Sequence, residues 1–428
     1  MALLLFLVVV LMLVFIGSLL TKRPSAKIGR LKLPSGQGVP MVSLGATHGL
    51  ILASDGSLWT WGSDFLGWPV LGLGTVHIQA CLGRIGNETN WISISAGTSH
   101  SLAIKSDGTL WAWGQDIYGE LGDGKPAFSQ NKPVPSAAGA DWKQVAAGGS
   151  HTIALKRDGT LWAWGNNWAG QLGINSMKDT LSPMQIGSGT NWVKIWAAML
   201  HGAAVQSDGS LWVWGDNPAN STQLSRSTQN FIAPTRISAD TNWVDAAFGN
   251  QVLLAIKSDG TLWAWGREAS NYTGVTGQPI IPTRVGTNSD WQFVSCAEWA
   301  RDIYVVLWKK DGSLWSLQSL YANATNLQPT QINLRKNWVA VAGGGGGNIG
   351  SIGMHDGVCS GVAITRDGEV WAWGRALGEF TPAHPLLQAF AALANKLRAN
   401  VRWGKPRPIM REQPWPLRNV DTNEISAK

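Results

Sequence analysis

Apolar and polar residues alternate along residues 103–114, which read Ala-Ile-Lys-Ser-Asp-Gly-Thr-Leu-Trp-Ala-Trp-Gly. A period of two is typical of half-buried β-strands. The Asp107-Gly108 pair in the middle favours a tight turn, because glycine accepts a positive φ and aspartate bonds to nearby backbone groups. The stretch therefore predicts a β-hairpin with Leu110 on the opposite face from Trp111 and Trp113. We expect Gly114 to end the strand at a point that has no room for a side chain.

The same pattern recurs seven times, at intervals of 50 to 56 residues. Each copy has an Asp-Gly pair, with the aspartates at Asp55, Asp107, Asp158, Asp208, Asp259, Asp311 and Asp367. A tryptophan follows each aspartate by four residues, and six copies continue with a second tryptophan and a glycine. The sixth copy instead reads Trp315-Ser316-Leu317-Gln318. A fixed period over most of a chain indicates a repeat architecture.

Other positions repeat in step with the hairpin. Seven residues before the aspartate, the first four copies carry a histidine: His48, His100, His151 and His201. A further strand begins at a tryptophan in most copies, at Trp91, Trp142, Trp192, Trp243, Trp291 and Trp338. Two copies carry Gly-Glu-Leu-Gly (119–122) or Gly-Gln-Leu-Gly (170–173), and several end in Pro-x-x-Val/Ile.

Taken together, this pattern resembles the regulator of chromosome condensation repeat over roughly residues 39–380. The resemblance implies an all-β fold, a seven-bladed β-propeller with one repeat of about 51 residues per blade. Elementary packing leads to the same expectation. Each unit offers about four short strands, which cannot bury both faces of a sheet alone and must pack against neighbouring blades.

The first twenty residues are almost purely apolar and predict a transmembrane anchor over 2–20, since nineteen residues of helix span a bilayer core. A cleaved signal peptide is the alternative. Residues 21–38 read as a basic stalk. Its positive charge favours a cytoplasmic propeller, whereas an apolar N-terminus before a large domain favours export. We expect a single-pass membrane protein, and the sequence leaves open on which side of the membrane the propeller lies.

The repeats occupy residues 39–382 in this interpretation, and residues 383–428 form a helix followed by a Pro-rich basic tail. One apolar stripe along Pro385 to Asn400 predicts the helix, which either packs on the propeller or lies on a membrane surface. A segment beginning at Lys405 and ending at Ile409 is a candidate for the last blade's missing Pro-x-x-Ile strand.

Composition narrows the possible functions. The net charge of +7 comes from the two ends, since residues 22–32 carry five basic and no acidic groups, and residues 396–428 carry eight basic and three acidic groups. The repeats are left with a charge of −3, which argues against a phosphate-binding face, so no nucleic acid is expected. Nineteen of the 26 tryptophans occupy repeat positions, which blade packing explains.

No catalytic, metal-binding or cofactor-binding constellation emerges. The histidines recur at one address on different blades, which indicates packing or hydrogen bonding. The aspartates form turns, and the three cysteines show no metal-ligand spacing. A glycine run at 343–347 lacks the Lys-Ser/Thr of a phosphate loop. We therefore expect a monomeric protein that is not an enzyme and has no cofactor.

The resemblance implies two precedents, a guanine-nucleotide exchange factor for a small nuclear GTPase and a bacterial inhibitor that caps β-lactamases. Both act by binding proteins. The leading hypothesis is thus a membrane-tethered protein-interaction scaffold with an unidentified protein partner. A GTPase exchange factor and a glycan- or cell-wall-binding propeller are the alternatives.

The loops after each Trp-x-Trp-Gly are the parts least constrained by the repeat, and we expect them to emerge on one rim. They carry aromatic residues at positions that blade packing does not require, which makes them candidate anchors for a partner. The alternative is that each tucks over the end of its own blade. These rim candidates are Phe65, Trp68, Tyr118, Trp168 and Tyr272.

Overall fold

The computed structural model of the protein describes most of the repeat region. The described residues are 32–64, 67–76, 78–125, 127–216, 230–249, 252–266, 282–296, 303–319, 329–332, 336–344 and 360–374. The predicted anchor at 2–20 and the predicted helix at 385–400 lie outside them. Among the described residues, no helix is both long and apolar enough to cross a membrane. Phe65, Tyr272 and the segment 405–409 also lie outside the described part.

The described residues form twenty-seven strands in seven antiparallel sheets, and within each sheet the strands pair in sequence order. The first four sheets are β1 (Met41–Leu44), β2 (His48–Leu52), β3 (Leu58–Ser63) and β4 (Ile78–Ile85); β5 (Trp91–Ala96), β6 (His100–Lys105), β7 (Leu110–Gln115) and β8 (Ser129–Pro135); β9 (Trp142–Ala147), β10 (His151–Lys156), β11 (Leu161–Gly165) and β12 (Thr180–Gln185); β13 (Trp192–Ala197), β14 (His201–Gln206), β15 (Leu211–Gly215) and β16 (Phe231–Arg236).

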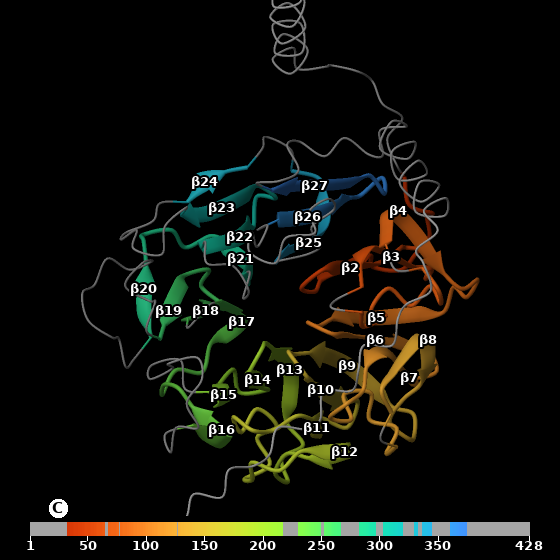
Figure 1. Cartoon of the computed structure of the whole chain (residues 1–428). Helices are drawn as coiled ribbons and strands as arrows, with labels where there is room; N and C mark the ends of the chain where they lie inside the picture. Colours follow the sequence, from red (N-terminus) through yellow and green to blue (C-terminus); the bar gives the residue numbers. More distant parts are fainter. Residues whose placement is uncertain are drawn as a thin grey trace, which may run out of the picture. The chain divides into compact units, whose positions relative to one another are not determined.

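The remaining three sheets follow the same order. They are β17 (Trp243–Gly249), β18 (Val252–Lys257), β19 (Leu262–Trp265) and β20 (Thr283–Val285); β21 (Trp291–Cys296), β22 (Ile303–Lys309), β23 (Leu314–Ser319) and β24 (Thr330–Gln331); β25 (Trp338–Gly344), β26 (Ser360–Thr365) and β27 (Val370–Gly374). Figure 1 shows the sheets following one another around a central opening. The predicted seven-bladed propeller is confirmed.

The Asp-Gly turns form as predicted. In all seven, the glycine has a φ between 78° and 85°, which a residue with a side chain rarely adopts. In blade two, Asp107 Oδ1 accepts hydrogen bonds from the backbone N–H and the hydroxyl of Thr109, at 2.9 and 2.6 Å. That hydroxyl in turn accepts a bond from the Trp111 indole at 3.1 Å. Each aspartate is therefore a turn former, and the first tryptophan of the hairpin is tied to the turn.

The tryptophans of the repeat pack against one another inside the blades. In blades two to seven, the tryptophan that begins the inner strand meets the first hairpin tryptophan of its own blade edge-to-face, with ring centroids 6.0–6.3 Å apart. Such a geometry suits the aromatic quadrupole. The pairs are Trp91–Trp111, Trp142–Trp162, Trp192–Trp212, Trp243–Trp263, Trp291–Trp315 and Trp338–Trp371.

The core consists of seven apolar clusters, one at each interface between neighbouring blades. The hairpin of blade two shows why its strands alternate. Trp113 packs into the cluster shared with blade one, and Leu110 and Ala112 pack into the cluster shared with blade three. Gly114 has a φ of 105°, and a Cβ there would lie 2.5 Å from the Ser99 carbonyl oxygen. Leu110 and Trp113 lie on opposite faces of the hairpin, and Gly114 ends its strand where a side chain would not fit, as the sequence predicts.

Hydrogen bonds also cross the interfaces. The indole N–H of the second hairpin tryptophan donates to a backbone carbonyl in a loop of the preceding blade: Trp113 to Val70 at 2.8 Å, Trp164 to Glu120 at 2.9 Å and Trp214 to Gln171 at 2.9 Å. All three tryptophans are buried. Each bond therefore fixes a loop of one blade to the core of the next.

Blade seven closes the ring. One apolar cluster joins Ile51 of blade one to Ala340 and Ile364 of blade seven, together with Leu33. Lys32 forms an antiparallel bridge with Glu369, and the Leu33 N–H donates to the Gly368 carbonyl at 2.9 Å. The sequence assigned these two N-terminal residues to a stalk. The structure instead places them against the last blade.

We expect Trp164→Phe to lower the free energy of unfolding by about 1–2 kcal/mol, because it removes a buried inter-blade hydrogen bond while it keeps most of the packing. Urea denaturation of the two proteins measures the difference. Trp162→Phe is the matched control, since its indole N–H donates only within its own turn, to Thr160, from a half-buried ring. Equal losses in the two variants would contradict the inter-blade role.

Candidate functional site

One face of the propeller carries the long loops together with the connections between the first two strands of the blades, some of which line the central channel. In blades one to six, the connection between the first two strands and the connection between the last two lie at the same end, because the strands are antiparallel. The Asp-Gly turns lie at the other end. We call the first end the loop face. Its described long loops are residues 64–77 of blade one, 116–128 of blade two and 166–179 of blade three, with gaps at 65–66, 77 and 126.

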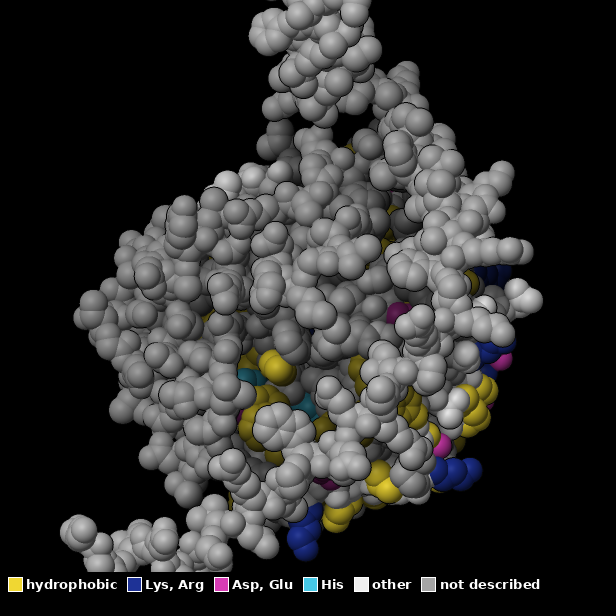
Figure 2. All heavy atoms as spheres, in the orientation of Figure 1, with side chains coloured by type: hydrophobic (Ala, Val, Ile, Leu, Met, Phe, Trp, Pro, Cys, Tyr) yellow, Lys and Arg dark blue, Asp and Glu magenta, His cyan; other side chains and the backbone are white. Residues whose placement is uncertain are grey.

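Among the described residues, the loop face holds most of the large exposed apolar side chains. Seven of the twelve large exposed hydrophobic residues lie in these loops, in the β13–β14 connection or at the start of an adjoining outer strand. In Figure 2, hydrophobic side chains are visible at the lower edge of the ring, over the region that Figure 1 labels β8 and β12. The seven exposed residues of the loop face are Val76, Ile117, Tyr118, Phe128, Met177, Leu181 and Met199.

Three of the predicted rim residues are described, and the structure places them on three neighbouring loops. Trp68 is half-buried and packs on Phe128 of blade two, with ring centroids 4.7 Å apart. Tyr118 is 39% exposed and Phe128 is 74% exposed. Trp168 is half-buried on the loop of blade three. Trp68 and Phe128 therefore form one aromatic pair across blades, and among the described residues no such ring contact involves Tyr118 or Trp168.

The loop of blade three is held rigid by its own side chains. Asn167 accepts a hydrogen bond from Leu172 N at 2.9 Å and donates to the Ser176 and Lys178 carbonyls at 2.8 and 3.0 Å. Gln171 accepts from Ala169 N and donates to Asn166 Oδ1. These bonds surround Trp168. A partner that contacts its ring would therefore have to order few further residues of the loop.

The loops are also tied to the next blade. Gly74 N donates to the Asn131 carbonyl, Gly124 N to the Leu181 carbonyl and Asn175 N to the Ile232 carbonyl, at 2.8–3.1 Å. Each bond joins the loop of one blade to the outer strand of its neighbour. The loop face from blade one to blade four is therefore a continuous, bonded surface rather than a set of independent loops.

Blade two holds its loop with acids where blade three uses amides. Asp116 and Glu120 stand at the positions of Asn167 and Gln171, and they accept hydrogen bonds from Leu121 N and Tyr118 N. Burial raises the pKa of Asp116 to about 6, with a smaller contribution from Asp123. Burial also raises the pKa of Glu120 to about 7, and the neighbouring Asp116 charge adds to this.

The recurring histidines lie beneath the loops in a fully buried layer. His48 Nε2 lies 2.7 Å from Ser101 Oγ, and His100 Nε2 lies 3.0 Å from Thr152 Oγ1, each across a blade interface. Burial lowers the pKa of His48, His100 and His151 to about 3, so these rings are neutral. Among the described residues, no group of three or more His, Cys, Asp or Glu side chains could hold a metal ion. The recurring histidines thus have the packing or hydrogen-bonding role that the repetition predicted: His48 and His100 bond across an interface, and His201 stacks on Phe248.

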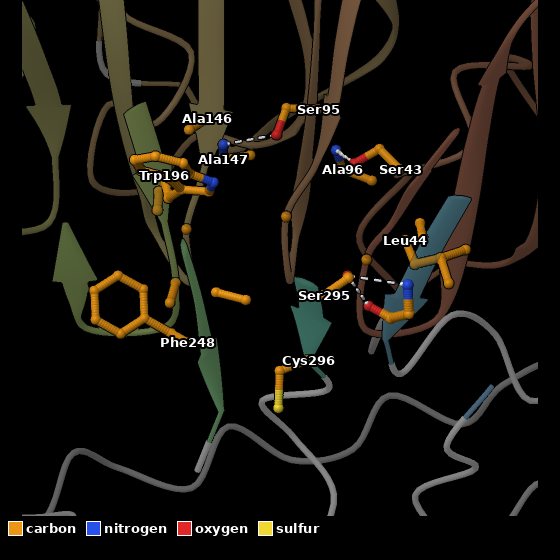
Figure 3. A pocket seen from close by; sticks show the side chains of 18 of the residues that line it. Ser43, Leu44, Ser95, Ala96, Ala146, Ala147, Trp196, Phe248, Ser295 and Cys296 are labelled. Carbon is orange, nitrogen blue, oxygen red and sulfur yellow. Dashed lines mark hydrogen bonds between the residues drawn. The ribbon is translucent and has the colours of Figure 1, made fainter. Parts of the chain in front are cut away.

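The inner strands line a channel of about 310 Å³. Most of its lining is alanine, glycine and serine, and Trp196, Phe248 and Cys296 from three successive blades also contribute to it (Figure 3). Side chains link the inner strands around it: Ala96 N donates to Ser43 Oγ and Ala147 N to Ser95 Oγ, both at 2.9 Å. The channel wall is therefore built by the same bonds that hold the blades together.

Sequence reasoning missed several of these residues. Ile117, Phe128 and Met177 stand in the loops that the repeat leaves variable, and only their apolar character there could have drawn attention. Three of the channel residues were visible as departures from the repeat, because Phe248 and Cys296 occupy the position of Ala96 and Ala147, and Trp196 that of Ser95.

The fold and this loop-lined face define a seven-bladed propeller built from Trp-rich repeats. A family model of the RCC1-like domain matches residues 16–350 of the chain. The protein thus belongs to the RCC1-like domain family.

Similar proteins cover this chain to different extents. The human probable E3 ubiquitin-protein ligase HERC6 is 38% identical over 157 residues, which are 35% of this chain and 15% of that protein. The Arabidopsis thaliana mitochondrial RCC1 domain-containing protein RUG3 is 31% identical over 57% of this chain and 46% of its own length. The chain thus spans less than half of the relatives that it matches here.

Solved structures share the fold. Human WBSCR16 superposes with a TM-score of 0.60 at 18% identity, over 74% of this chain and 85% of that one. Prp20p of Saccharomyces cerevisiae superposes with a TM-score of 0.58 at 20% identity, over 83% and 85% of the two chains. At these identities the likeness concerns the fold alone.

We expect Glu120→Gln to stabilise the protein at pH 8 by an amount on the order of 2 kcal/mol, with little effect at pH 4. Because the folded-state pKa lies above the ordinary value, the stability that this carboxyl contributes is present at low pH and is lost as the pH rises through about 7. Melting temperatures across this range measure the effect. Gln171→Glu is the reciprocal variant and should destabilise increasingly over the same window; a pH-independent effect in both would contradict the buried-acid explanation.

Proposed function

We propose that this protein is a non-catalytic, protein-binding scaffold whose loop face contacts a partner, and that residues 2–20 tether it to a membrane. The concentration of exposed apolar side chains on bonded loops is the observation that supports the binding surface. Apolar and aromatic side chains at the centre of a contact supply most of the binding energy in protein interfaces. Rigid loops reduce the entropy lost when a partner binds.

The character of the loop face favours a protein partner over a polyanion. Its three described loops carry three exposed or half-exposed acidic groups, Asp64, Asp123 and Asp179, and two basic ones, Lys125 and Lys178. A further basic group, Lys132, lies on the adjoining strand. Binding to phosphate backbones needs clustered positive charge. A mixed rim around aromatic groups is typical of protein interfaces.

The similar proteins are consistent with this proposal. The yeast protein Prp20p has binding properties toward Gsp1p and histones, and both of these are proteins. A Caenorhabditis elegans relative is named a retinitis pigmentosa GTPase regulator homolog, with 40% identity over 22% of this chain. The name of this relative supports a GTPase exchange factor as an alternative function. A glycan-binding propeller is the other alternative.

Two assays separate these alternatives from the scaffold. Acceleration of nucleotide release from purified small GTPases by the full chain would indicate the exchange factor. Retention on insoluble polysaccharide would indicate the glycan-binding protein. Affinity capture with the full chain in detergent, followed by mass spectrometry, identifies a protein partner.

We expect Trp168→Ala to weaken capture of that partner by roughly 2 kcal/mol or more in binding free energy, with little change in melting temperature. The ring is half-buried on a loop that other side chains hold, so its removal should leave the fold intact. Trp162→Ala is the control: that ring packs edge-to-face on Trp142 and under Lys156, so its loss should lower the melting temperature instead. A large drop in melting temperature for Trp168→Ala with unchanged capture would assign Trp168 to packing.

We expect the full-length protein to remain in the membrane fraction after extraction with alkaline carbonate, because a helix of nineteen almost purely apolar residues is long enough to span the bilayer core. The matched control is a chain that lacks residues 2–20, which should be released. A mature N-terminus between residues 20 and 26, read by N-terminal sequencing, would show a cleaved signal peptide instead of an anchor.

A further inference from the structure

The long loops of blades two and three share one backbone conformation. Each has three residues with positive φ at equivalent positions, with values of 82°, 74° and 76° in blade two and 80°, 67° and 58° in blade three. The third of these residues donates its N–H to the outer strand of the next blade in both loops. An atom of one loop can therefore be located from its counterpart in the other. The equivalent pairs are Gly119 and Gly170, Gly122 and Gly173, and Gly124 and Asn175.

In blade three, one amide side chain holds the loop closed. Asn167 Oδ1 accepts a hydrogen bond from the Leu172 N–H at 2.9 Å. The Nδ2 group of the same amide donates to the backbone carbonyls of Ser176 and Lys178, at 2.8 and 3.0 Å. The amide can join the two arms of the loop because it offers both an acceptor and a donor.

In blade two, the residue at this position is Asp116, whose ionised carboxylate can only accept. Asp116 Oδ1 accepts from the Leu121 N–H at 3.0 Å, so the carboxylate is oriented as the amide is. Oδ2 therefore takes the place of the amide nitrogen, on the side of the Lys125 and Ala127 carbonyls. Asp116 is fully buried, and Oδ2 has no hydrogen-bond partner. No hydrogen bond between described residues reaches either carbonyl. Three oxygen acceptors thus face one another without a donor.

We propose that this loop binds a calcium ion through Asp116 Oδ2 and the backbone carbonyl oxygens of Lys125 and Ala127. A cation there makes, with both carbonyls, the contacts that the Asn167 amide makes in blade three. Calcium fits this ligand set, because it prefers carboxylate, carbonyl and water oxygens and tolerates an irregular geometry, whereas magnesium demands a near-ideal octahedron. Gly124 and Lys125 are exposed, so water can reach this part of the loop and complete the coordination.

The charge around Asp116 also favours a cation. Glu120 and Asp123 belong to the same loop, whereas blade three has Gln171 and Ile174 at these positions. None of the ion pairs among the described residues involves the three acids of this loop. A buried carboxylate without a positive partner is costly, and a bound cation removes that cost.

A proton on Asp116 is the competing occupant. It turns Oδ2 into a single donor, which can bond to only one of the two carbonyls, whereas a cation contacts both. Burial raises the pKa of Asp116 to about 6, so most of this proton is lost at pH 8. Measurements at pH 8 therefore separate the two occupants.

Calorimetric titration of calcium chloride into the full-length protein tests the proposal, in detergent micelles at pH 8 after divalent ions have been removed with a chelator. We expect saturable binding, and Asp116→Asn should weaken it by at least about tenfold, because it removes the only carboxylate ligand. The variant should still fold, since asparagine stands at the same position in blade three. Its melting temperature in the chelator confirms this.

Asp179→Asn is the matched control. It removes one acidic group from the loop of blade three, where Asp179 accepts a hydrogen bond from the Asn167 N–H, and it should leave the calcium affinity unchanged. Equal losses of affinity in Asp116→Asn and Asp179→Asn would show a non-specific effect of charge and overturn the site. Magnesium with the same affinity as calcium would overturn the assignment of the metal.

Hydrogen exchange read by mass spectrometry locates the ion. Calcium should slow exchange in peptides that cover residues 116–128 and leave residues 167–179 unchanged, because the amide already closes the second loop. Absence of binding heat, or calcium-induced protection elsewhere without any in residues 116–128, overturns the proposal. A loop of blade two whose exchange responds to pH and not to calcium assigns the position to a proton. Each of these outcomes is read without a protein partner, so it is independent of the proposed scaffold function.

Discussion

The burial of each blade's two faces against its neighbours is the constraint on which the rest of this structure depends. A four-stranded sheet of five- or six-residue strands has too little apolar surface to be stable alone. Here every sheet shares an apolar cluster with the blade on either side, and the seventh cluster joins the last blade to the first. Stability is therefore a property of the closed ring, and any unpaired seam exposes the faces of two blades at once.

The same constraint explains why the loop face is suited to binding. The indole N–H of Trp164 is buried in an interface, yet its acceptor, the Glu120 carbonyl, lies in the loop of the preceding blade. Gly124 of that loop then bonds to the outer strand of the following blade. Each loop is thus fixed from below by a core tryptophan and from the side by a neighbouring strand. The apolar groups that it exposes are presented on a scaffold that packing has already ordered.

The sequence predicted the structural features that recur in the copies of the repeat. It could not predict the features in which the copies differ. The hairpins, the turn role of the aspartates, the facing of Leu110 and Trp113 and the number of blades all follow from a periodic pattern with a direct physical meaning. Contacts between blades do not, because the partner of Trp113 is a backbone carbonyl of Val70, and a carbonyl leaves no trace in the sequence. The pairing of Lys32 with Glu369 is equally invisible, since it joins residues more than three hundred positions apart without a recurring motif.

The candidate binding residues show the same limit. Trp68, Tyr118 and Trp168 were selectable because they depart from the repeat, but only the structure shows that Trp68 pairs with Phe128 of the next blade. Phe128 precedes an outer strand rather than following a Trp-x-Trp-Gly directly, so its place beside Trp68 depends on how two blades dock. A rim made by neighbouring loops is a property of the ring, and it cannot be read from one repeat at a time.

The buried acids of blade two illustrate how a repeat tolerates variation at a cost. Asp116 and Glu120 make the loop contacts that Asn167 and Gln171 make in blade three, and an amide does this without burying a charge. An acid in the same place must either hold a proton or carry an ion in a dry site, which is why its pKa rises. The loop that presents Tyr118 therefore depends on protonation, whereas the adjacent loop that presents Trp168 does not. The loops of blades two and three are built from the same repeat. They differ in their response to pH because Asp116 and Glu120 replace an asparagine and a glutamine.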